Sequence, residues 1–156
     1  MTYQVARQPL LAAIILAGLA FALAAGCSHK KFDRPTGVTP QRMEVLAACY
    51  SMYLGKHQGH FPPEESTLKT FIRSDCKYIL SKHGISDAGS IFVSDRDNKP
   101  LEVTYAKGAG TREFGPETII AHEETGVAGK RLVALGSGVV REFDAATLDG
   151  IIHAER

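Results

Sequence analysis

Two histidines three positions apart are the side chains in this sequence best suited to binding a metal ion. His57 and His60 lie in a stretch rich in glycine and proline, and Glu64 and Glu65 follow it closely. Two imidazoles and a carboxylate could bind zinc or copper. We interpret the stretch as a solvent-exposed loop, shaped by glycine and proline so that Phe61 packs on the core. A metal site is the alternative.

The three cysteines divide into one at the end of an apolar leader and two further along the chain. Cys49 and Cys76 leave an even number of thiols in a chain whose leader would direct it to an oxidising compartment, so they could form a disulfide. The alternative is two small buried apolar residues. A catalytic pair with His83 or His122 is not supported, because neither cysteine lies in a recognisable nucleophile motif.

Two acidic segments carry oxygen or nitrogen ligands but match no metal-binding motif. His122-Glu123-Glu124 lies at the end of an expected strand, and Asp95-Arg96-Asp97-Asn98 lies in an expected turn. The turn lacks the glycine and the later glutamate of a calcium loop, and we interpret both segments as surface turns. The sequence contains no phosphate-binding loop, serine nucleophile elbow or zinc-protease motif. We therefore predict no cofactor and no enzymatic activity.

The first 26 residues differ in composition from the rest of the chain. Their one charged residue is Arg7, so the other 17 basic residues and all 17 acidic residues follow them. Such a neutral remainder argues against a nucleic-acid partner. The apolar run from Leu10 to Ala25 is shorter than the roughly 20 residues that a transmembrane helix needs. A positive residue, an apolar run and small residues before a cleavage point predict a signal peptide over residues 1–26.

The end of this leader, Leu23-Ala24-Ala25-Gly26-Cys27, resembles the lipobox of bacterial lipoproteins. The resemblance implies that the Cys27 sulfur receives a diacylglyceryl group, that cleavage makes Cys27 the first mature residue, and that its amino group is acylated, for instance by palmitate. Several acyl chains would anchor the protein stably, at about 0.8 kcal/mol for each buried methylene. Ser28 follows in place of an aspartate, which by resemblance to the enterobacterial sorting rule favours the outer membrane.

Residues 27–38 contain basic residues, proline and glycine with little apolar content. This composition predicts a flexible tether between the lipidated cysteine and the domain. Its basic residues could contact anionic headgroups, or they could simply be solvated. Both interpretations leave membrane lipid as the partner of the acylated terminus.

Residues 39–156 contain the patterns of one folded domain. Thr39-Pro40 predicts a helix start, and apolar residues at three- and four-residue spacing predict an amphipathic helix over 40–54. A second helical pattern covers 68–83, with a break at Ser74-Asp75 where the aspartate could begin a new turn.

Short β-like runs separated by glycine, proline, asparagine and aspartate predict a set of strands after Gly89, and residues 101–106 alternate clearly. Their ranges are 91–94, 101–106, 118–122, 131–135 and 139–143. Gly136-Ser137-Gly138 suits a hairpin between the last two, residues 107–116 form a loop, and Asp144 can cap a final short helix. Helices followed by strands predict an α+β fold in which the long helix packs on a small antiparallel sheet.

Two segments carry a further resemblance. The helix over 40–54 runs into Tyr53-Leu54-Gly55-Lys56-His57-Gln58-Gly59-His60-Phe61-Pro62, which resembles the helix and loop of type II secretion pseudopilins. Residues 118–142 resemble the closing hairpin of pilin-like extracytoplasmic proteins, except that Ser137 and Val139 replace an aspartate and a histidine of that signature. The resemblance implies a pilin-like fold. It implies no polymerising role, because the chain has a lipobox and a polar tether where pseudopilins have a prepilin cleavage site and a continuous hydrophobic stem.

Together these patterns predict a lipoprotein anchored on the periplasmic, extracytoplasmic side of the cell envelope. Its domain would act without catalysis as an interaction or structural module for an envelope protein partner, through the sheet edge or the 107–116 loop. The alternative is an envelope metal-binding protein or enzyme that uses His57, His60 or His122.

Overall fold

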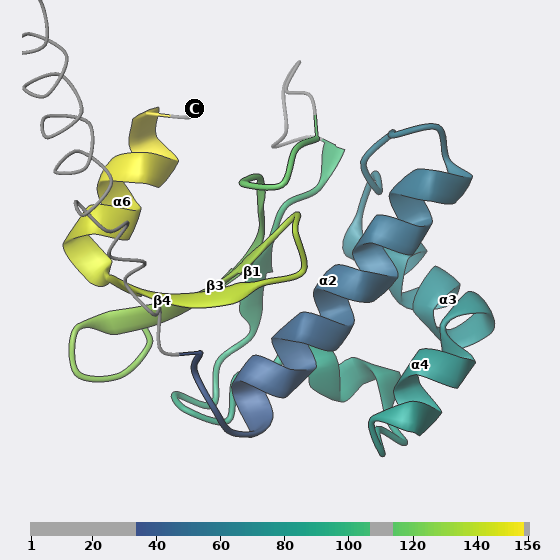
Figure 1. Ribbon diagram of the computed structural model, residues 1–156, viewed down its shortest axis with the longest axis horizontal. Helices are drawn as coiled ribbons and strands as arrows, with labels where there is room; N and C mark the ends of the chain where they lie inside the picture. The colour runs from purple at the N-terminus through teal and green to yellow at the C-terminus, as the bar shows by residue number, and fades with distance from the viewer. Residues whose placement is uncertain (1–33, 107–113, 155–156) are drawn as a thin grey trace, which may run out of the picture. The chain divides into compact units, whose positions relative to one another are not determined.

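The computed structural model describes residues 34–106 and 114–154, which form an α+β domain (Figure 1). Three predicted features lie outside the described residues. They are the signal peptide over 1–26, the first part of the tether with Cys27, and residues 107–113 of the predicted loop. The prediction of an α+β fold with one antiparallel sheet is confirmed.

Three helices make up what we call the helical layer. They are α2 (Val38–Lys56), α3 (Glu65–Asp75) and α4 (Lys77–Lys82). α2 contacts both the sheet and the other two helices, and Figure 1 shows it between the sheet and the α3–α4 pair. The predicted helix over 40–54 is therefore confirmed, and the structure extends it by two residues at each end.

The start of α2 differs from the prediction. Gly37, with φ 123°, occupies the N-cap position, and no side chain caps the first turn. The Thr39 hydroxyl instead accepts a hydrogen bond of 2.9 Å from the backbone N–H of Asp95. Thr39, which the sequence suggested as a cap, thus connects the first turn of α2 to a turn more than fifty residues later.

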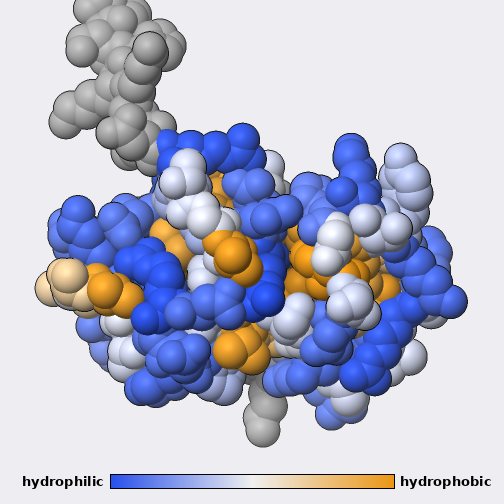
Figure 2. All heavy atoms as spheres, turned by 90° about the horizontal axis from the view of Figure 1, so that it is seen from below, coloured by the Kyte–Doolittle hydropathy of each residue, from blue (hydrophilic) through white to orange (hydrophobic). Residues whose placement is uncertain are grey.

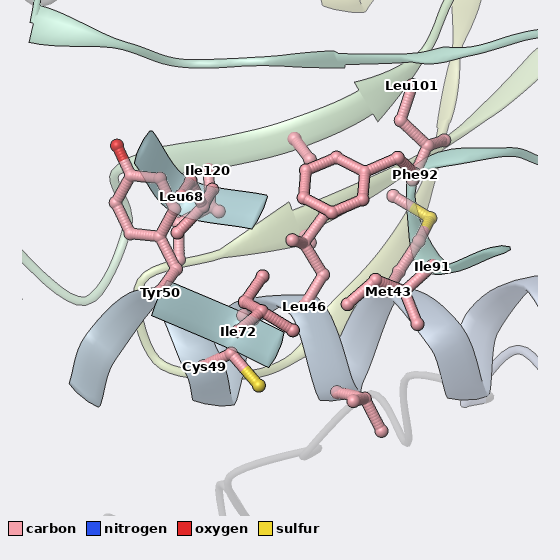
Figure 3. Packing of buried hydrophobic residues seen from close by; sticks show 14 of the residues in the cluster. Met43, Leu46, Cys49, Tyr50, Leu68, Ile72, Ile91, Phe92, Leu101 and Ile120 are labelled. Carbon is pink, nitrogen blue, oxygen red and sulfur yellow. The ribbon is translucent and has the colours of Figure 1, made fainter. Parts of the chain in front are cut away.

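α2 is buried over a wider arc than the single apolar face that the sequence predicted. Val45 and Cys49 lie off the stripe formed by Leu46 and Tyr50, yet all four are at most 1% exposed. The reason is that α2 is covered by the sheet on one side and by α3 and α4 on another. Figure 3 shows side chains from these elements packed in one cluster, among them Met43, Leu46, Tyr50, Leu68, Ile72, Ile91, Phe92, Leu101 and Ile120.

The second helical pattern was predicted to break at Ser74-Asp75, and in the structure the break lies at the next residue, Cys76. Cys76 follows the last residue of α3 and precedes the first residue of α4, with φ −100° and ψ 14°. The side chains of its neighbours Asp75 and Lys77 are exposed, whereas Cys76 itself is buried. The break therefore places a buried thiol at a bend whose flanking residues face solvent.

The sheet is an antiparallel meander in the order β1-β2-β3-β4. Its strands are β1 (Leu101–Val103), β2 (Ile119–Glu123), β3 (Lys130–Leu135) and β4 (Val140–Asp144). Each matches a predicted strand to within one residue at its start. β1 ends three residues before the predicted end, and Thr104 and Ala106 donate backbone hydrogen bonds to Ile120 and Pro62.

The predicted strand over 91–94 is wrong. Residues Ala88–Phe92 form a 3₁₀ helix, η1, and only Val93 makes a β-bridge, with Pro100. The Asp87 carboxylate accepts a hydrogen bond of 2.9 Å from the Gly89 N–H and so caps this turn. Ile91 and Phe92 are consecutive and both buried, a pattern that the tight turn of a 3₁₀ helix against α2 and α3 accommodates.

The last helix, α6 (Ala145–Ala154), covers the face of the sheet opposite α2. Leu132 and Ala134 of β3 belong to the cluster around α2, while the alternate residues Val133 and Leu135 pack with Leu148 of α6. Side chains alternate between the two faces of a strand, so the sheet is covered on both sides. α6 follows β4 directly, in the place predicted for a final helix.

Candidate functional site

The structure does not combine His57 and His60 into a metal-binding set. The His57 ring stacks on Tyr53, with centroids 4.0 Å apart and an angle of 20° between the rings, and it also lies edge-on to Phe71. His60 is exposed. Glu64 accepts a hydrogen bond from Ser66, and Glu65 forms an ion pair with Lys69 within α3. Within residues 34–106 and 114–154, no three metal-ligating side chains lie together.

The loop around these histidines has the shape expected of a packed, solvent-exposed connection. Gly59 has φ 84°, a left-handed conformation that suits glycine. Phe61 packs against the core and lies edge-on to Tyr50 at 6.3 Å and to Phe114 at 6.4 Å. Pro62 is buried. His57 therefore contributes an aromatic contact at the end of α2.

Glu123, expected in a surface turn, is instead fully buried at 0% exposure. One carboxylate oxygen accepts a hydrogen bond of 2.7 Å from the Ser94 hydroxyl, and the other accepts one of 2.8 Å from the Leu132 N–H. The Arg96 guanidinium lies 3.6 Å from the second oxygen. A buried carboxylate is costly unless it is paired and hydrogen-bonded, and here both oxygens have donors.

Asp97 lies beside this carboxylate and is bound in a similar way. One oxygen accepts hydrogen bonds of 2.9 Å from the Gly126 N–H and 2.9 Å from the Thr125 hydroxyl, and the other accepts one of 3.2 Å from the Lys99 N–H. Partial burial by itself raises the pKa of Asp97, but these hydrogen bonds to the charged form outweigh it and leave the pKa lowered. Asp97 thus connects its own turn to the β2–β3 connection.

We call Ser94, Arg96, Asp97, Glu123 and Glu142 the turn network. Arg96 connects two of these carboxylates, because its guanidinium lies 3.0 Å from Glu142 of β4 and 3.6 Å from Glu123 of β2. The neighbouring Asp95 pairs with Arg42 of α2 at 2.8 Å. The network therefore fixes the turn between η1 and β1 to the sheet and to α2.

The turn network was not predicted from the sequence. The two acidic segments over 95–98 and 122–124 were interpreted there as separate surface turns. One signal was present, since Glu123 lies two positions after Ala121 in the same strand and so falls on the same buried face. His122 points the other way, is half-buried and has Nδ1 3.0 Å from the backbone oxygen of Glu123. Both oxygens of Glu123 and of Asp97 accept hydrogen bonds from the protein, so this site is better suited to holding the fold than to binding a ligand.

Two surface hollows lie on either side of the segment over residues 84–87. The larger, of about 650 Å³, lies against α3 and α4 and includes Arg73 and Lys77 in its lining. The smaller, of about 330 Å³, reaches the start of α2 and includes His83. Figure 2 shows hydrophobic atoms bordered by hydrophilic ones on the half of the molecule that contains α3 and α4. Neither hollow is lined by His57, His60 or His122.

Cys49 and Cys76 are free thiols in the structure, and both are at 0% exposure in the cluster around α2. Cys49 lies in α2 and Cys76 at the bend between α3 and α4, so two elements bring together residues that are 27 positions apart in the sequence. The disulfide between them stays a prediction.

Comparison of the chain with known protein families, with curated proteins and with solved structures found no match. Among the described residues, no helix combines the length and the apolar character that crossing a membrane requires. Cys27, the predicted lipidation site, lies outside the described residues.

Proposed function

We propose that this protein is a lipid-anchored extracytoplasmic lipoprotein whose pilin-like domain acts without catalysis as an interaction or structural module of the cell envelope. The observation that carries the proposal is the sequence Leu23-Ala24-Ala25-Gly26-Cys27 at the end of the apolar leader. Small residues directly before a cysteine at the cleavage position are what lipidation requires.

The short segment between Cys27 and α2 supports a position of the domain close to the membrane. Cys27 precedes Val38, the first residue of α2, by 11 positions. A fully extended chain spans at most about 3.6 Å per residue, so this connection reaches about 40 Å at most. An acyl chain on Cys27 would therefore keep the domain close to the membrane surface, where its partners would also be membrane-associated.

The pilin-like part of the proposal is supported by the order of the elements. A long helix and a loop ending in Phe61-Pro62 come first and an antiparallel sheet with a closing hairpin comes later, as the resemblance implies, with α3, α4 and η1 between them. The segment before α2 is polar and basic, and it ends at Gly37, the N-cap residue of the helix. We propose that the domain keeps the pilin-like packing while a lipid takes the place of the hydrophobic stem.

The interaction role is proposed for the sheet edges. β1 and β4 are the outer strands, and an outer strand has backbone groups that a partner strand can pair with. The carboxylates of the turn network already accept hydrogen bonds from the protein. An edge therefore offers a partner more unoccupied hydrogen-bonding groups than this network does.

Lipidation is tested by growing cells with an alkyne analogue of palmitate and separating membrane from soluble fractions. The wild-type chain should carry the label and sediment with membranes, and Ser28→Ala is the matched control that should do the same. Cys27→Ala should lose the label and become soluble. If Cys27→Ala stayed in the detergent-insoluble membrane fraction, the lipid anchor would be rejected.

The interaction role is tested with a photo-cross-linking residue placed at exposed positions of the anchored protein. Glu102 of β1 and Asp144 of β4 report on the two edges, and Tyr78 of α4, which is 78% exposed, is the control. An edge contact predicts a discrete adduct from Glu102 or Asp144 and none from Tyr78. Equal labelling at all three positions, or an adduct from Tyr78 alone, would contradict it.

A further inference from the structure

The two thiols of the domain form a pair inside the helical layer. Cys49 of α2, labelled in Figure 3, and Cys76 belong to the same core cluster. Both side chains are at 0% exposure. α2 contacts both α3 and α4, and Cys76 is the residue at which those two helices meet.

The pair is asymmetric. A hydrogen bond between the two thiols is the largest influence on both, and it lowers the pKa of Cys76 while it raises the pKa of Cys49. Burial raises the pKa of both thiols, the charge of Asp75 raises that of Cys76 further, and the charge of Lys56 partly offsets these effects for Cys76. The hydrogen bond stabilises a thiolate on the sulfur that accepts it, and the position of Cys76 at the bend between two helices gives Cys76 that role.

The position of Cys76 also gives it the shorter route to solvent. It lies at the bend between two helices, and its neighbours Asp75 and Lys77 are exposed. Cys49 lies in the middle of α2, which is covered on two sides. A local movement of the bend would expose the Cys76 sulfur and leave α2 in place.

We propose that Cys49 and Cys76 are a redox pair that closes to a disulfide, with Cys76 as the attacking thiolate and a small or protein disulfide as the oxidant. The Cys76 thiolate attacks one sulfur of the oxidant, whose S–S bond breaks and releases one thiolate. Cys49 then loses its proton to water and attacks the Cys76 sulfur, which releases the second thiolate. Two protein thiols are oxidised to one disulfide, and the oxidant disulfide is reduced to two thiols.

The product would fasten α2 to the bend between α3 and α4. The bond would form in the cell because the proposed location outside the cytoplasm is oxidising, and this part of the inference rests on the proposed function. The chemistry of the pair does not rest on it, because oxidation can be carried out on the purified full chain.

The bond is tested by alkylating the full chain directly from cells, digesting it with trypsin without reduction, and identifying the peptides by mass. The expected species is Met43–Lys56 joined to Ser74–Lys77, which separates into two peptides after reduction. Finding the two peptides unlinked and alkylated in the unreduced sample, or either of them joined to a Cys27 peptide, would overturn the pair.

The order of attack is tested on purified full chains treated with oxidised glutathione. Cys49→Ala should accumulate the mixed disulfide on Cys76 at least several times faster than Cys76→Ala accumulates it on Cys49. Equal rates, or a faster reaction at Cys49, would overturn the assignment of Cys76 as the attacking group. Circular dichroism of both variants controls for loss of folding, and the linked wild-type peptide needs no variant.

The two proposals fail separately. If the purified chain forms the linked peptide with glutathione but the chain taken from cells does not, the pair is correct and the proposed location is wrong. If neither sample forms it, the pair is wrong, while the labelling of Cys27 still decides whether the protein is lipid-anchored.

Discussion

Different forces hold the helical layer and the turn network, in which Ser94 and Glu123 are buried while Glu142 is exposed. In the helical layer, apolar side chains such as Leu46, Ile72 and Leu68 pack against one another and need no specific partner. In the turn network, Glu123 and Asp97 depend on donors placed at hydrogen-bonding distance. Apolar packing loses stability in proportion to the volume removed, whereas a charged network loses it when one partner or one charge is lost.

This difference predicts how each region responds to mutation and pH. Changes in the helical layer should cost more and should be insensitive to pH. Changes in the turn network should cost less, and their effect should depend on the ionisation of the carboxylates. The predictions below run from the largest expected effect to the smallest.

Leu46→Ala should have the largest effect. Leu46 is at 0% exposure between the sheet and the other helices, and a leucine truncated in such a site costs about 2–5 kcal/mol of unfolding free energy. Urea denaturation at neutral and at mildly acidic pH should give the same loss. Leu148→Ala in the smaller cluster under α6 is the matched control and should fall at the low end of that range. A larger loss for Leu148→Ala than for Leu46→Ala would contradict the expectation that the cluster around α2 contributes more to stability than the cluster that contains Leu148.

Reduction of the Cys49–Cys76 disulfide should come next. The chain-entropy model gives roughly 3.5 kcal/mol for a bond that closes a loop of this length. Denaturation of the oxidised and the reduced full chain should differ by about that amount, while Cys49→Ala should be unaffected by reductant. An identical midpoint for the two forms would show that the helical layer gains nothing from the bond.

Glu123→Gln removes the buried charge and keeps the shape of the side chain. Hydrogen bonds to a charged group contribute about 1.5–3 kcal/mol, so we expect a loss of about 2 kcal/mol at neutral pH. Glu124→Gln is the matched control, because that neighbour is exposed and forms a surface ion pair with Lys99. Equal and small losses for the two variants would mean that the turn network does not depend on its buried charge.

Asp97→Asn should lower the stability at neutral pH and make the stability less sensitive to acid. The pKa of Asp97 is lowered in the folded state, so its contribution is fully present above the unfolded pKa of about 3.9 and is lost as the pH falls through the lower folded value. The loss at neutral pH should be about 1 kcal/mol. Denaturation between neutral pH and pH 3 should show a shallower acid loss for the variant. Parallel curves for the variant and the wild type would contradict this role.

His57→Ala should have the smallest effect, because the ring is exposed and gains mainly from stacking on Tyr53. An aromatic pair of this kind contributes about 0.5–1 kcal/mol. In calorimetry, the wild type and His60→Ala should give no heat of zinc binding. A zinc-binding heat in the wild type that His60→Ala lowers would instead favour a metal site in the loop.

The elements themselves were largely predictable from the sequence, because periodicity is a local property. Apolar spacing placed α2, Ser74-Asp75 placed the break before α4 to within one residue, and β-like runs between turn residues placed the four strands of the sheet. Residues 91–94 were predicted wrongly, because a short apolar run suits both a strand and a buried 3₁₀ turn. The aspartate cap and the contacts with α2 and α3 decided between them.

From the sequence alone came the change in composition after residue 26, the neutral formal charge of the remaining residues and the order of helices and strands. Only the tertiary structure decided that Glu123 is buried with Ser94, that α2 is covered on two sides, and that Cys49 meets Cys76. The physical reason is that a sequence pattern reports which side chains share a face of one element. Which faces meet depends on packing between residues tens of positions apart, and no local period records it.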